Sequence, residues 1–152
     1  MRAKRQKIMG EKEFEEMVGC EGPVLAMLID TEGCIYAAKS HDYYVPEITV
    51  EMASLMPITT AQKWGGYVYK RPPVGKHKRS YRWQVLPEHK RAFLKKVKPH
   101  LQLKREQAEN AVKMLDVWEN KAQGWKLESC RRAACMRILN DSEPPDIDLE
   151  KT

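Results

Sequence analysis

The side chains best able to do chemistry in this 152-residue chain are basic ones gathered in its middle. From Ala61 to Ala108 there are 14 lysines and arginines but two acids, Glu88 and Glu106, which gives this stretch a charge of +12. The remaining residues hold 13 basic and 19 acidic side chains. A basic middle flanked by acidic segments is typical of a surface that faces a polyanion. Charge alone leaves a merely solvated face open as the alternative.

Cysteine and histidine do not form a recognisable metal site in the sequence. Cys20, Cys34, Cys130 and Cys135 make no CxxC pair and have no histidine at zinc-ligand spacing. We therefore expect free thiols in a reducing intracellular compartment, either nucleoid-associated or organellar. Glutamates follow the basic N-terminus where a signal peptide needs an apolar stretch, and no apolar run approaches the roughly 20 residues of a bilayer span. Secretion and membrane insertion are therefore not expected.

The N-terminal part of the chain has helical periodicity on both sides of a proline. Residues 11–18 predict a short helix, and Gly22-Pro23 predicts a break. The segment from Val24 to Asp30 predicts a second helix that is apolar almost all round, with Gly33 as a left-handed cap. Such a helix should be buried on more than one side.

Two pairs of strands are predicted next. Alternation of apolar and polar residues predicts strands over 34–39 and 47–52, and a Pro/Gly/Lys loop between 66–71 and 80–86 predicts a long hairpin. Ile48, Val50 and Trp83 should point inward. The polar side chains between them should point to the other face.

Helical patterns return over 87–97, 105–121 and 127–139. The predicted fold is α+β in the order αββαββα, with an extra C-terminal helix and with the helices on one face of an antiparallel sheet. We expect one domain over residues 1–141, with its core over about 12–121 and the last helix over about 127–140, and a mobile acidic tail over 142–152. The face without helices must meet water or a partner, and a two-stranded ribbon fits the major groove of DNA.

One segment carries a resemblance to a known family. The nine residues from Leu25 to Gly33 read LAMLIDTEG and resemble the LAGLIDADG motif of homing endonucleases, with seven positions identical or conservatively changed. The segments around Gly65–Val68 and Tyr81–Trp83 resemble the second hairpin of that family. Pro99–Ala108 resembles the segment that carries its basic active-site residue. The resemblance covers roughly residues 12–118, in the right order and spacing.

The resemblance implies a saddle-shaped DNA-binding sheet and a homodimer, because the chain has a single motif. The motif helices would pack across a two-fold axis through Leu25, Ala26, Leu28 and Ile29. Each would end on an acid, here Glu32, next to the backbone carbonyl of Thr31. Two carboxylates brought together repel unless divalent cations lie between them, and Mg²⁺ suits oxygen ligands of this kind. No organic cofactor is implied.

The resemblance also assigns roles to other residues. Lys104 matches the lysine near the nucleophilic water, although a phosphate contact is the alternative. Asp30 is expected to cap the helix end or to meet backbone amides rather than to bind a metal. Ser54 is the nearest candidate for a polar active-site residue from the region 53–65. That region is shorter than the helix usual in the family, and Met27 replaces the usual glycine.

The expected activity is site-specific, Mg²⁺-dependent cleavage of both strands of a long pseudo-palindromic duplex. An RNA maturase or a non-cleaving DNA-binding protein on the same scaffold is the alternative. The residues expected to contact DNA are Tyr36, Ser40, Glu47, Thr49, Glu51, Tyr69, Arg71, Lys76, Lys78, Arg79, Ser80, Arg82 and Gln84. Among these, Lys76, Lys78 and Arg79 are expected mostly to hold the DNA backbone.

Overall fold

A computed structural model describes residues 4–5, 11–53, 66–73, 75 and 79–141. Its helices are α1 (Glu11–Glu32), α3 (Lys90–Val97), α4 (Arg105–Asn120) and α5 (Trp125–Asp141), with short 3-10 turns η1 (Pro87–His89) and η2 (Lys98–His100). Its strands are β1 (Lys4–Arg5), β2 (Gly33–Ser40), β3 (Tyr43–Met52), β4 (Tyr67–Arg71) and β5 (Ser80–Gln84). The expected acidic tail (142–152) and the shortened region before β4 lie outside the described residues, apart from Ala53.

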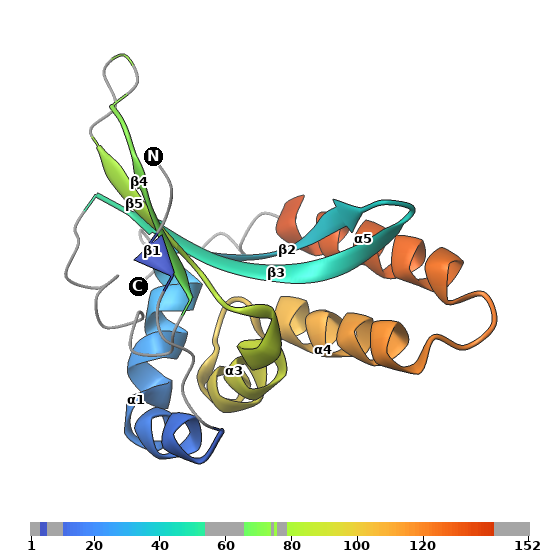
Figure 1. The fold of residues 1–152 in the computed structure, drawn as a ribbon, viewed down its shortest axis with the longest axis horizontal. Helices are drawn as coiled ribbons and strands as arrows, with labels where there is room; N and C mark the ends of the chain where they lie inside the picture. The colour runs from blue at the N-terminus through green and yellow to red at the C-terminus, as the bar shows by residue number, and fades with distance from the viewer. Residues whose placement is uncertain (1–3, 6–10, 54–65, 74, 76–78, 142–152) are drawn as a thin grey trace, which may run out of the picture.

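The strands form one antiparallel sheet in the order β1-β4-β5-β3-β2. Helices α1, α3 and α4 gather below its curved strands in Figure 1, and α5 packs on α4 and on the β2–β3 hairpin. The predicted α+β class and the four longer strands are confirmed. The short strand β1 was not predicted, because two residues carry no periodicity.

Trp83 lies at the centre of the core. It is fully buried and pairs in register with Val50 on β3 and Val68 on β4. Its ring packs against Phe93 of α3 with 5.6 Å between the ring centroids. Ile48 is also fully buried, so the inward face was predicted correctly. Burying each of these side chains contributes about 1.5–3 kcal/mol.

The predicted break at Gly22-Pro23 is wrong, because α1 runs unbroken from Glu11 to Glu32 with Pro23 inside it. A proline inside a helix costs about 3 kcal/mol. Burial of Leu25 and Ile29, each 1% exposed, offsets that cost. Gly22 is buried against η2, and a Cβ there would lie 3.3 Å from His100 Cδ2. Packing therefore holds the helix together where local propensity favours a break.

Gly33 is not a left-handed cap, since positive φ among the described glycines occurs at Gly66, Gly75 and Gly124. Its role is steric: a Cβ on Gly33 would lie 2.7 Å from the Ile29 Cα. The chain can therefore turn from α1 directly into β2 only without a side chain at this position. Of the helices described, none has the length and apolar composition that a bilayer span requires.

Gly66 gives the fold a testable constraint. It has φ +108°, and a Cβ there would collide with the Gln84 carbonyl oxygen and lie 2.7 Å from Trp83 Nε1. We expect Gly66→Ala to lower the free energy of unfolding by about 2 kcal/mol or more, measured by urea denaturation. Gly124→Ala is the matched control, because its φ is +78° but no atom lies within 4 Å, and it should cost about 1 kcal/mol. Equal losses would contradict the importance of the close approach.

Candidate functional site

The C-terminal end of α1 is tied to the loop before α4 by Asp30. Its carboxylate accepts hydrogen bonds from the backbone amides of Gln102 (2.7 Å), Leu103 (3.1 Å) and Lys104 (3.0 Å). These amides belong to the loop that ends at Lys104, the residue just before α4, and the carboxylate supplies their acceptor. The prediction that Asp30 meets backbone amides is confirmed.

Lys104 also ties the loop before α4 to the end of α1, but as a hydrogen-bond donor. Its Nζ donates to the backbone carbonyls of Ile29 (2.8 Å), Asp30 (3.0 Å) and Gly33 (2.8 Å). An ammonium group has three protons, so these bonds occupy all of its donors. Burial lowers the pKa of Lys104, while the negative charges of Cys34, Asp30 and Glu32 oppose the shift. Lys104 thus caps the carbonyls of α1 in place of the expected glycine cap.

Glu32 is left exposed as the last residue of the clamped helix. Thr31 beside it is also exposed, and its hydroxyl donates to the Met27 carbonyl at 2.8 Å. Carboxylate and carbonyl oxygens are ligands that Mg²⁺ accepts, so the chemistry of these donors fits the expected cation. Within the described residues of one chain, no three His, Cys, Asp or Glu side chains gather into a metal cluster.

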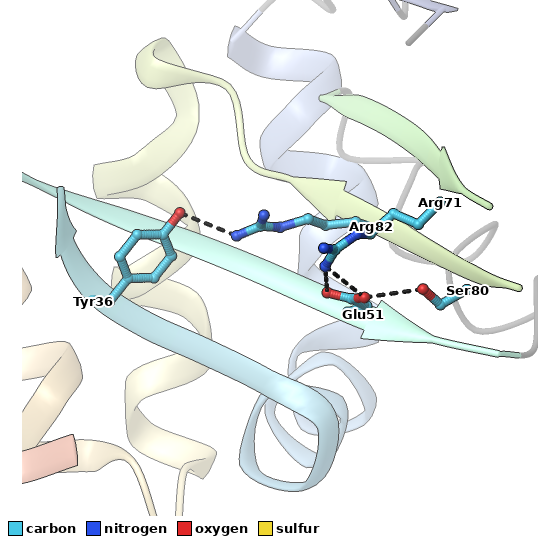
Figure 2. Close-up of polar contacts among 5 residues, drawn as sticks. All are labelled: Tyr36, Glu51, Arg71, Ser80 and Arg82. Atoms are coloured by element: carbon cyan, nitrogen blue, oxygen red, sulfur yellow. Dashed lines mark hydrogen bonds and ion pairs between the residues drawn. The ribbon is translucent and has the colours of Figure 1, made fainter. Parts of the chain in front are cut away.

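The face of the sheet opposite the core carries a polar network (Figure 2). Arg71 Nη1 lies 2.9 Å from both carboxylate oxygens of Glu51, and the Ser80 hydroxyl donates to Glu51 Oε1 at 2.9 Å. Arg82 Nη2 donates to the Tyr36 hydroxyl at 3.3 Å. Five of the expected DNA contacts therefore lie together on one face and hold one another in place. Burial raises the pKa of the Tyr36 hydroxyl, and the positive charge of Arg82 opposes that shift.

A second group lies on the same face nearer the middle of β3. Glu47 accepts hydrogen bonds from Gln84 Nε2 at 2.9 Å and from Lys90 Nζ at 3.0 Å. Thr49 lies on β3 and pairs in register with Cys34 on β2 and with Gln84 on β5. It is 4% exposed. Thr49 is therefore largely removed from solvent in this chain, and its contact with DNA stays a prediction.

Other predicted contacts fall in three places. Tyr69 and Ser40 are half-buried on β4 and β2, and Arg79 is exposed before β5. Lys76, Lys78 and the active-site candidate Ser54 lie outside the described residues. The roles of all of these residues stay predictions.

The predicted dimer interface needs correction. Leu25, Ala26 and Ile29 are at most 1% exposed, because they pack into the core of their own chain. Leu28 packs only partly against that core. Among the side chains of α1 that the structure describes, from residue 22 onward, Val24 (60% exposed) and Met27 (69% exposed) are the apolar ones that point outward.

Sequence reasoning missed Val24 and Met27 as outward residues because an all-apolar helix does not reveal which side is inside. Helical spacing was the available signal, since Val24, Met27, Leu28 and Thr31 follow the pattern i, i+3, i+4, i+7. The burial of Lys90 was also missed. It has no local sequence signal, because its partner lies 43 residues away.

Mutations of the two acids at the end of α1, Asp30 and Glu32, should have different effects on the free energy of unfolding. Asp30→Ala removes a charged acceptor from three amides and should lower the free energy of unfolding by about 2–3 kcal/mol in urea denaturation. Glu32→Ala is the matched control two positions away. It should change stability by less than about 0.5 kcal/mol, because Glu32 is exposed. A stability loss at Glu32 as large as that at Asp30 would contradict the division between a structural and a functional acid.

Solved structures share the fold of this chain. The chain is 24% identical to the homing endonuclease I-CvuI bound to the I-CreI target with Mg, where the DNA is not cleaved, with a TM-score of 0.69 over 86% of this chain and 88% of that one. I-CvuI with its own target and Ca gives 25% identity and a TM-score of 0.67 over 88% and 89%. The intron-encoded homing endonuclease I-CeuI, complexed with DNA, gives 14% identity and a TM-score of 0.52 over 74% and 69%.

No family model matches the sequence, and no curated protein matches it either. The structural likeness to I-CvuI extends over most of the chain. The resemblance carried by the LAMLIDTEG segment is thereby confirmed, and the chain has the fold of the LAGLIDADG homing endonucleases.

Proposed function

We propose that this chain is a site-specific DNA endonuclease that acts as a homodimer and hydrolyses one phosphodiester bond in each strand. The observation that supports this most directly is the position of Glu32. It is an exposed carboxylate at the end of a helix whose terminus is fixed by the bonds of Asp30 and Lys104. A fixed, solvent-facing acid is suited to binding a cation against a phosphate.

The proposed DNA surface is the helix-free face of the sheet. It presents Arg71 and Arg82, which can donate to guanine or to phosphates, together with Glu47, Glu51 and Gln84. Antiparallel ribbons of this kind enter the major groove. The solved structures of I-CvuI and I-CeuI, which share this fold, contain DNA.

A second copy of the chain would complete the site. The exposed apolar side chains of α1, Val24 and Met27, can pack against the same residues of a partner across a two-fold axis. Such packing would bring the two Glu32 carboxylates near each other. Two carboxylates in one place repel unless cations separate them, which favours the binding of Mg²⁺ by Glu32 and the Thr31 carbonyl of each copy.

Each residue would then contribute a different part of the chemistry. A divalent cation bound there would polarise the phosphate and lower the pKa of the attacking water. Glu32 holds the cation, and Asp30 keeps the helix end in place. Lys104 places a positive charge beside the developing negative charge while its protons hold the α1 carbonyls. We therefore assign Lys104 a positioning role as well as an electrostatic one.

The activity can be tested without knowing the target. Duplexes selected by the protein from a randomised library with Ca²⁺ would be incubated with Mg²⁺ or with EDTA. We expect metal-dependent breaks in both strands, and a loss of at least about a hundredfold in rate for Glu32→Gln with binding retained. Glu109→Gln, an exposed acid on α4, should cut as the parent does.

Cutting by Glu32→Gln at the parent rate would contradict the proposal. Selected duplexes that shift in a gel but stay intact with every divalent cation would favour the non-cleaving binder. Preferential binding of structured RNA over all selected duplexes would favour the maturase.

The dimer has its own test. Met27→Glu places a charge in the proposed interface and should raise the dimer dissociation constant at least about tenfold in sedimentation equilibrium, because a buried unpaired charge is costly. Ile138→Glu is the matched control on α5, because Ile138 is 68% exposed and Met27 is 69% exposed. Equal effects of the two substitutions, or a parent that stays monomeric on its selected DNA, would contradict a dimer built on α1.

A further inference from the structure

Lys90 is a buried cation that the proposed reaction does not use. It is the first residue of α3, and its side chain is 7% exposed. A helix start disfavours positive charge, and removing an ammonium group from water is costly. Its Nζ nevertheless lies 3.0 Å from Glu47 Oε1 on β3. The buried ammonium group of Lys90 therefore forms an ion pair with a carboxylate on β3, a strand that also carries proposed DNA contacts.

The pair lies where β5 leaves the sheet. Strand β5 ends at Gln84, and the amide of the next residue, Val85, still donates to the Ile48 carbonyl at 3.1 Å. The chain then turns through η1 into α3, which brings Lys90 next to the stretch of β3 that β5 no longer covers. The Glu47 side chain is 15% exposed, so both charges are largely removed from water.

Glu47, which Lys90 holds in place, also contacts Gln84. Its second oxygen, Oε2, accepts a hydrogen bond from Gln84 Nε2 at 2.9 Å. An ionised carboxylate can only accept, so the amide group of Gln84 must turn its nitrogen toward Glu47. The Gln84 carbonyl oxygen and the second N–H of its amide are then left for another partner.

Gln84 borders a hollow on the helix-free face. This hollow has a volume of about 340 Å³, and Tyr69, Arg71 and Arg82 also line it. A glutamine whose oxygen accepts and whose amide donates side by side matches adenine, which offers the N6 amino group and the N7 acceptor in the major groove. With its amide reversed, the same side chain would lose one of these two bonds.

We propose that Lys90 is a specificity-positioning residue: it fixes Glu47, which orients the Gln84 amide to read an adenine in each half-site. The inference rests on the proposed function, because it requires this face to bind DNA. Lys90 itself touches no base. It acts by stopping the Gln84 amide from turning over and by neutralising a carboxylate that would otherwise repel phosphates.

The test uses the base preferences of the full-length protein, measured by selection from a randomised duplex library with Ca²⁺ and sequencing. We expect an adenine at one position of each half-site, and Gln84→Ala should abolish that preference. Lys90→Met should reduce the same preference about tenfold while leaving the other positions unchanged. Lys95→Met is the matched control, since Lys95 is an exposed lysine on the same helix, and it should keep every preference.

Loss of one partner of a buried ion pair can also unfold the protein. The double variant Glu47→Gln/Lys90→Met removes both charges and should melt closer to the parent than Lys90→Met does, while its adenine preference stays relaxed. A folded Lys90→Met or double variant with the parent preference would overturn the inference and leave the proposed function intact. A parent protein that selects no sequence at all would overturn the proposed function before any variant is made.

Discussion

The reciprocal junction between α1 and the loop before α4 is the interaction on which the rest of the site depends. Asp30 accepts from three amides of that loop, and Lys104 donates to three carbonyls around the helix end. The two sets of bonds supply partners to amides of the loop before α4 and to carbonyls at the end of α1 and at Gly33. They also fix the direction in which Glu32 leaves the helix. One sequence motif thus contains a structural acid and a solvent-facing acid two residues apart.

Charge on the proposed DNA surface is organised by similar pairing. Glu51 is held by Arg71, and Glu47 is held by Lys90, so acids that would repel phosphates are neutralised within the protein. The exposed pair of Arg71 and Glu51 contributes little stability, because water screens it. It fixes where donors and acceptors point, which would lower the entropic cost of binding in the proposed DNA complex.

Much of the fold could be predicted from periodicity, whereas the site could be predicted only where a motif marked it. Alternation placed Ile48 and Val50 inward, because strand geometry has a period of two. Pro23 misled the prediction of α1, since tertiary packing overrode a local signal. The motif resemblance marked Lys104, but its bonds to the α1 carbonyls and the burial of Lys90 could not be foreseen, because they depend on residues 43 to 75 positions away. The nearly uniform apolar motif also hid which of its side chains point outward.

The central claim is that Glu32 from each of two copies holds the cation against DNA. The most direct measurement is a crystal structure of the protein on its selected duplex with Mn²⁺, with the ions located by anomalous scattering. We expect Mn²⁺ peaks about 2.0–2.2 Å from Glu32 carboxylate oxygens of both copies and from a DNA phosphate. Ions bound away from Glu32, or a single copy of the chain on the duplex, would contradict this claim.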